Sequence, residues 1–82
     1  MQLKSWVIEI DERDHMVEVE WWPPFGRGDV YADGELVYSW SPGLRGMPEK
    51  NNFEAFGKPF HLKKKGFVFT KPELYFEGNL VP

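Results

Sequence analysis

The sequence contains no cysteine among its 82 residues. Without thiols the chain can form neither a disulfide framework nor a thiolate nucleophile, and such a chain fits a reducing compartment. It also lacks any apolar run near the ~20 residues that a membrane-spanning helix needs. No basic stretch followed by an apolar segment opens the chain, as a secretory leader would require. We therefore expect a soluble, unprocessed, cytoplasmic protein without a membrane partner.

Helical periodicity is missing as well. Nowhere do apolar residues recur at helical spacing over ten residues or more. Apolar and polar residues instead alternate with period two, as in residues 5–10 and 17–22, which is typical of strands with one buried face. The sequence therefore predicts an all-β protein with no substantial helix.

A seven-residue phrase occurs twice, at 31–37 (YADGELV) and at 75–81 (YFEGNLV). Each copy places an acidic residue before a Gly, and such a pair supplies the positive φ that a two-residue hairpin turn demands. Further turns are expected at residues 11–14, at Gly57-Lys58 and at Lys65-Gly66, and a break at Lys71-Pro72. We expect eight or nine strands, at 5–10, 17–22, 29–32, 35–40, 53–56, 60–63, 67–70, 74–77 and 79–81.

These hairpins predict one antiparallel β-sandwich domain over residues 1–82, with the turn-rich segment 41–52 as the crossover between its halves. A chain of this length buries only about 60–65% of its surface, so its core needs large side chains, and aromatics make up 17% of the sequence. The predicted core consists of the inward-phase residues Trp6, Ile8, Ile10, Val17, Val19, Trp21, Leu36, Tyr38, Trp40, Phe60, Leu62, Phe67, Phe69, Leu74 and Phe76.

The charges are distributed unevenly along the chain, whose net charge is −3. Residues 1–40 hold three basic and nine acidic residues, whereas residues 41–82 hold seven basic and four acidic ones. If the halves form different sheets, the surface is dipolar and favours self-association into a homo-oligomer. If strands of the two halves are neighbours, the charges pair on one solvated face. The acidic total argues against general nucleic-acid binding.

Catalytic constellations are absent from the sequence. The two histidines, His15 and His61, lie in different hairpins, where a solvated or pairing role is the default. No hydroxyl lies in a strained, Gly-flanked turn. The acidic cluster at residues 11–14 lacks the ligand pattern of a calcium loop and is expected to be a solvated hairpin tip. We therefore expect no enzymatic activity, no metal and no cofactor.

Two segments are candidate binding sites. In residues 21–25 (WWPPF), neighbouring tryptophans must face opposite sides of a strand, so Trp22 either packs over the prolines as a lid or joins Phe25 in an exposed recognition surface. Lys63, Lys64 and Lys65 precede a Phe-Val-Phe strand, a combination found in single-strand nucleic-acid platforms. Lysines beside a turn are also ordinary solubilising and edge-protecting residues.

The order of several motifs resembles domains of the Fas apoptotic inhibitory molecule family. These motifs are His15-x-Val17-Glu18-Val19-Glu20, Gly26-x-Gly28, Val30-Tyr31-Ala32-Asp33-Gly34, Trp40, Phe53-x-x-Phe56-Gly57 and Leu74-Tyr75-Phe76-Glu77-Gly78. The resemblance implies a compact antiparallel β-sandwich, a cytosolic setting and a non-enzymatic role in binding proteins, including stressed or misfolded clients. It carries over no catalytic or cofactor residue.

The leading hypothesis is thus a non-catalytic protein-binding module. Two alternatives remain open. One is a small-ligand or glycan-binding sandwich that uses Trp22 and Phe25, and the other is a small β-barrel that binds nucleic acid through Lys63, Lys64 and Lys65.

Overall fold

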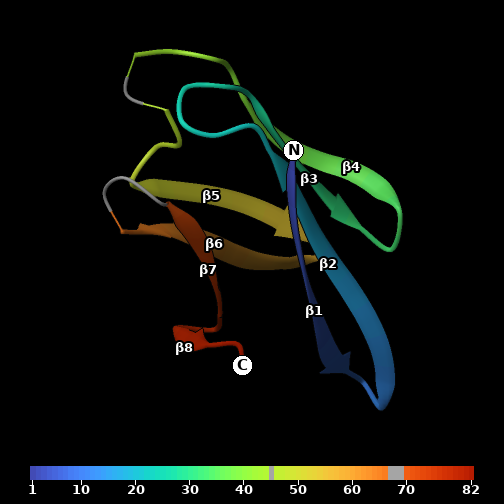
Figure 1. Ribbon diagram of the computed structural model, residues 1–82. Coiled ribbons are helices and arrows are strands. Elements are labelled where there is room, and N and C mark those ends of the chain that lie inside the picture. Colours follow the sequence, from blue (N-terminus) through green and yellow to red (C-terminus); the bar gives the residue numbers. More distant parts are fainter. Residues whose placement is uncertain (45, 67–69) are drawn as a thin grey trace.

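A computed structural model describes residues 1–44, 46–66 and 70–82, which form two antiparallel sheets of four strands each (Figure 1). Sheet A contains β1 (Gln2–Ile10), β2 (Arg13–Trp21), β3 (Gly28–Ala32) and β4 (Glu35–Trp40), in that order. Sheet B contains β5 (Lys50–Ala55), β6 (Lys58–Lys65), β7 (Lys71–Phe76) and β8 (Asn79–Leu80). The predicted all-β sandwich is confirmed. Over the described ranges no helix is long and apolar enough to cross a membrane.

The strands are joined in both sheets by tight turns of one kind. Each of four hairpins closes on two residues with positive φ: Asp11-Glu12, Asp33-Gly34, Phe56-Gly57 and Glu77-Gly78. Two consecutive residues with positive φ define the type I′ turn, whose twist matches that of the flanking strands. Both turns of the repeated phrase are confirmed.

Two predicted turns are wrong in their limits. The first hairpin turns on two residues instead of the expected four, because Arg13 already pairs with Ile10. The turn expected at Gly57-Lys58 lies one residue earlier, because the type I′ conformation places its Gly second and Phe56 first. In both hairpins the turn geometry, and not polarity, decides where the strands end.

The core lies between the sheets and is built from alternate residues of both. In β1 and β2 the buried residues follow the predicted period, and Phe60, Leu62 and Leu74 fill the facing side of sheet B. Tyr38 and Phe76 are half-buried and pack against this core. The prediction missed the buried residues Val30, Ala32, Met47, Phe53 and Ala55. Phe67 and Phe69 lie outside the described residues.

Among the described residues, Leu36 is the one predicted core residue that lies on the outside, with 53% of its surface exposed. A β-bulge causes this, because Val30 pairs with Tyr38 whereas Tyr31 pairs with Leu36, so that Val37 is an extra residue in β4. The bulge reverses the alternation of β4. Val37 therefore packs against the core in place of Leu36.

Other boundaries also differ from the predictions, beginning with β1 and β2, which start at Gln2 and Arg13 and not at residues 5 and 17. The crossover ends at residue 49, because β5 already begins at Lys50. Lys71-Pro72 opens β7 and does not interrupt it, since the Pro72 nitrogen faces away from β6 and needs no hydrogen bond there. The strand expected at 67–70 falls on 67–69, outside the described residues, and on Thr70, which precedes β7.

The two halves of the chain form different sheets, which fulfils the condition for a dipolar surface. Outward-phase positions of sheet A carry the acidic residues Glu9, Asp14, Glu18, Glu20 and Asp29. The corresponding positions of sheet B carry four lysines, Lys50, Lys63, Lys65 and Lys71, against two glutamates, Glu54 and Glu73. Opposite faces of the sandwich therefore differ in the sign of their charge.

Gly28 lies between two tryptophans across sheet A, opposite Trp21 on one side and Trp40 on the other. A Cβ atom at Gly28 would overlap the indole ring of Trp40. We expect Gly28→Ala to lower the free energy of unfolding by about 2 kcal/mol, because the displaced indole belongs to the core. Gly43→Ala is the control, since a Cβ there meets no atom. Urea denaturation should show a change within about 0.5 kcal/mol for this control.

Glu12 occupies the second turn position of the β1–β2 hairpin with φ of 65° and a full side chain. The left-handed region costs an ordinary L-residue roughly 1–2 kcal/mol, and a Gly in the same position avoids this cost. Part of the gain is offset because Gly has a larger conformational entropy in the unfolded chain. Glu12→Gly should therefore raise the free energy of unfolding by about 0.5–1 kcal/mol. Glu54→Gly, in the exposed phase of β5, should lower it by a similar amount in urea denaturation. A loss of stability in Glu12→Gly would show that the left-handed conformation of Glu12 is not strained.

Candidate functional site

Two loops meet at one end of the sandwich. The loop 22–27 joins β2 to β3, and the loop 41–49 joins sheet A to sheet B, as Figure 1 shows near its upper edge. The first loop is closed by the Trp22 N–H donating to the Arg27 carbonyl at 3.0 Å and the Gly26 N–H donating to the Trp22 carbonyl at 2.6 Å. The Gly43 N–H donates to the Phe25 carbonyl at 3.0 Å. Backbone hydrogen bonds thus fix the two loops to each other.

The neighbouring tryptophans of this region separate as strand geometry requires. Trp21 ends β2 in the core with 5% of its surface exposed, whereas Trp22 is 37% exposed on the opposite side. The Arg27 guanidinium lies 5.9 Å from the centroid of the Trp22 ring, a cation–π distance. Trp22 is therefore partly exposed, with the Arg27 guanidinium beside its ring.

A buried carboxylate holds this arginine in position. Arg27 Nη2 donates to both carboxylate oxygens of Asp29, at 2.8 and 2.9 Å, and Asp29 is almost fully buried. The hydrogen bond to Asp29, reinforced by the charge of its carboxylate, raises the pKa of Arg27. The ion pair thus orients the guanidinium that flanks the Trp22 ring.

Phe25, 55% exposed, lies in the same loop. We call Trp22, Phe25 and Arg27 the aromatic platform. Gly26 is essential to its shape, because a Cβ there would collide with the Trp22 carbonyl. A solvent-facing indole beside a cation, with an exposed phenyl in the same loop, can stack on planar or apolar groups of a ligand.

A surface cleft of about 370 Å³ lies beside the platform, on the Trp21 side of the loop. It is lined by Gln2, Leu3, Lys4, Trp21, Pro23, Thr70 and Lys71. The Lys4 ammonium donates to the Pro72 carbonyl at 3.5 Å and lies 5.2 Å from the centroid of the Trp6 ring. With two ammonium groups and an indole wall, the cleft is chemically suited to a small anionic group.

The structure does not bring the three predicted lysines together as one platform. Lys63 Nζ lies 4.6 Å from the centroid of the Tyr75 ring, and Lys65 Nζ lies 3.8 Å from a carboxylate oxygen of Glu73. Lys64 takes the opposite phase of β6 and is half-buried. Alternation along the strand therefore separates the middle lysine from the other two.

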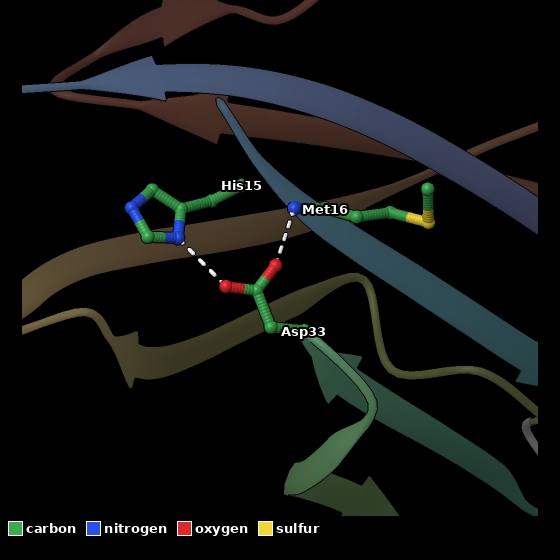
Figure 2. A network of polar contacts seen from close by, with 3 residues as sticks. All are labelled: His15, Met16 and Asp33. Atoms are coloured by element: carbon green, nitrogen blue, oxygen red, sulfur yellow. Dashed lines mark hydrogen bonds and ion pairs between the residues drawn. The ribbon is translucent and has the colours of Figure 1, made fainter. Parts of the chain in front are cut away.

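His15 takes part in the polar network drawn in Figure 2. Its Nδ1 lies 2.7 Å from Asp33 Oδ2, and Asp33 Oδ1 accepts from the Met16 N–H at 2.8 Å. The Asp33 N–H in turn donates to the Met16 carbonyl at 2.8 Å. The imidazole also packs on Phe56, with ring centroids 4.3 Å apart. The network joins the β3–β4 turn to β2 and to the first turn of sheet B.

A histidine beside an aspartate supplies two of the three members of a catalytic triad, which also needs a nucleophile. Within the described ranges no hydroxyl group is hydrogen-bonded to His15 or Asp33. His61 pairs separately with Asn52, at 3.2 Å. In the same ranges no three His, Asp or Glu side chains gather as a metal site would require. Both histidines thus take the pairing role that the sequence suggests.

The sequence predictions missed two of the polar pairs that shape this region. Arg27 and Asp29 are two residues apart at the start of β3, which places their side chains on one face of an extended segment. That spacing is a usable signal. The pairing of His15 with Asp33 leaves no comparable mark, because only the register between β2 and β3 brings the β3–β4 turn beside His15.

The Met16 N–H and His15 together lower the pKa of Asp33, with the backbone hydrogen bond as the larger cause. A carboxyl with a lowered folded-state pKa stabilises the fold above its unfolded pKa of about 3.9, and this contribution disappears as pH falls through the folded value. Asp33→Asn should therefore unfold at lower temperature than the parent protein at pH 7. The difference should shrink below about pH 4. A difference in melting temperature that is constant from about pH 7 to about pH 2 would contradict this role of the Asp33 carboxylate.

Comparison of the chain with models of known protein families, with curated proteins and with solved structures finds no match. The geometry of the chain itself therefore carries the functional inference.

Proposed function

We propose that this protein is a non-catalytic protein-binding module that uses the aromatic platform to hold apolar segments of stressed or misfolded clients. The observation that carries the proposal is the fixed, exposed indole of Trp22, flanked by an arginine that Asp29 holds. Aromatic residues and arginine are the side chains that most often dominate binding energy at protein interfaces.

Rigidity supports the same interpretation. The two loops are tied together by backbone hydrogen bonds, so that a ligand need not order the platform when it binds. Phe25 adds a second exposed aromatic side chain in the same loop, and two such anchors suit an extended chain more than one compact group. The motif order of the sequence, which resembles a family of protein-binding sandwiches, is compatible with this proposal.

The distribution of lysines gives less support to nucleic-acid binding. Lys64 lies on a different face from Lys63 and Lys65, and the Lys65 ammonium lies near Glu73. The nearby cleft, lined by Lys4 and Lys71, keeps small-ligand binding as the second candidate function. A small anion would bind there without using Phe25, which does not line the cleft.

The proposal is tested by the aggregation of reduced insulin chains, followed by light scattering. The parent protein should delay aggregation in proportion to its concentration, and the double variant Trp22→Ala, Phe25→Ala should lose most of this effect. Loss of exposed apolar anchors at an interface costs about 2 kcal/mol or more each at the strongest positions. Leu36→Ala is the matched control, because Leu36 is about as exposed as Phe25 but lies on β4.

Circular dichroism of all variants would establish that they are equally folded. Equal protection by the parent protein, the double variant and Leu36→Ala would contradict the role of the platform. No delay by the parent protein, at several-fold molar excess over insulin, would contradict the client-binding function.

A further inference from the structure

Among the residues that the structure describes, the outer edge of β1 is a long strand edge that pairs with no other strand. β1 is the first strand in the order of sheet A, and its nine residues pair with β2 on one side. In a hairpin with a two-residue turn, the pair next to the turn exchanges both hydrogen bonds, which here is Ile10 with Arg13. Even-numbered residues of β1 therefore direct their backbone groups to β2. The N–H and C=O groups of Leu3, Ser5, Val7 and Glu9 point away from the sheet.

The far edge of sheet A and one edge of sheet B carry features that discourage pairing. A bulge interrupts β4. On the edge of β7, Pro72 has no N–H to offer, and its carbonyl accepts a hydrogen bond from the Lys4 ammonium. The Leu74 carbonyl on the same edge accepts from the Val81 N–H. Prolines, bulges and covered backbone groups are the usual protection of strand edges. None of these features occurs on the outer edge of β1 among the described residues.

The side chains next to this edge are apolar. Leu3 and Val7 are 54% and 60% exposed on the outer face of β1, and Met16, directly opposite Val7 in β2, is 41% exposed. Between them lies Ser5, small and uncharged. A strand that is long, apolar and unpaired invites a further strand.

We propose that the occupant of this edge is a second copy of the chain, and that two β1 strands pair antiparallel to join two sheets A into one eight-stranded sheet. In the preferred register Ser5 of each copy faces Ser5 of the other. Leu3 of each copy then faces Val7 of the other, so apolar side chains meet on the outer face. The odd-numbered residues of both copies present free backbone groups in this register, which allows about six new hydrogen bonds.

The alternative registers are less favourable. A shift by two residues in one direction places Leu3 opposite Glu9, which opposes an apolar side chain to a charge. A shift in the other direction shortens the paired segment. Like any antiparallel pairing of two identical strands, this register closes on a twofold axis, here through the Ser5 pair, so that association stops at the dimer.

Charge does not drive this dimer. The nearest acidic side chains of the two copies would be Glu9 on β1 of one copy and Glu20 on β2 of the other, two strand spacings across and two residues along, about 12 Å apart. This separation exceeds the Debye length of about 8 Å at physiological ionic strength, so the repulsion is screened. Added salt should therefore tighten the dimer slightly. A different mode of association, in which the acidic face of one copy binds the lysine-bearing face of another, would instead weaken as salt is added.

The absence of cysteine from the chain permits a direct test. Ser5→Cys places two thiols across the twofold axis, with Cα atoms about 5.5 Å apart in a hydrogen-bonded pair. A short bis-maleimide should join the two copies rapidly into one covalent dimer. Ser39→Cys is the matched control, because Ser39 is equally an exposed serine on the outer face of sheet A, but on the opposite edge strand β4. It should react without forming a dimer.

Sedimentation measurements on the uncross-linked chain complete the test, over concentrations from about 5 to 500 µM. The parent protein should show a monomer–dimer equilibrium. Ser5→Lys should weaken it at least ~10-fold, because like charges then face each other directly. Ser39→Lys, with the same change of charge, should leave it unchanged. A monomer throughout the range, equal cross-linking of the two cysteine variants, or weakening by salt would each overturn the proposal.

The dimer interface is separate from the aromatic platform. Trp22→Ala, Phe25→Ala should therefore dimerise as the parent protein does, and Ser5→Lys should keep its effect on insulin aggregation. Failure of one proposal is thus distinguishable from failure of the other.

Discussion

The type I′ turn is the constraint on which the rest of this structure depends. In four hairpins two residues with positive φ fix which residues of the flanking strands are opposite each other. A slip by one residue in the first hairpin would turn Trp6, Ile8 and Ile10 outward and leave the small core without its largest contributions. The turns therefore set the strand register locally, and packing of the core stabilises that register.

In the correct register, each strand of sheet A has an inner face toward sheet B and an outer face on the opposite side. The inner face packs on sheet B, where Tyr38 of β4 donates to Asn51 of β5 at 2.9 Å across the gap. The outer face carries five of the nine acidic side chains of residues 1–40, because the acidic half of the chain supplies the whole sheet. The same alternation separates Trp21 from Trp22, so that one indole stabilises the fold and the other is available to a partner. Adjacent residues thus supply a buried core side chain and the exposed side chain of the proposed platform.

Much of the fold could be predicted from the sequence. Alternation identified the buried faces of β1 and β2, and the two acid-Gly pairs located the β3–β4 and β7–β8 turns correctly. The prediction was wrong where the sequence carries no local signal for the conformation that the chain adopts. Nothing in residues 35–40 indicates a bulge, so Leu36 was assigned to the core. Glu12 adopts a conformation that its residue type does not favour, because the strands on both sides hold it there.

The sequence by itself determined the all-β class, the buried faces of β1 and β2 and the turns of the two hairpin phrases. These properties depend on the conformational preferences of single residues and on period-two alternation, both of which are local. Only the tertiary structure decided that Trp22 is exposed beside Arg27, that Asp33 meets His15, and that β1 has a free edge. Each of these depends on which strands become neighbours, and that is set by packing between residues far apart in the chain.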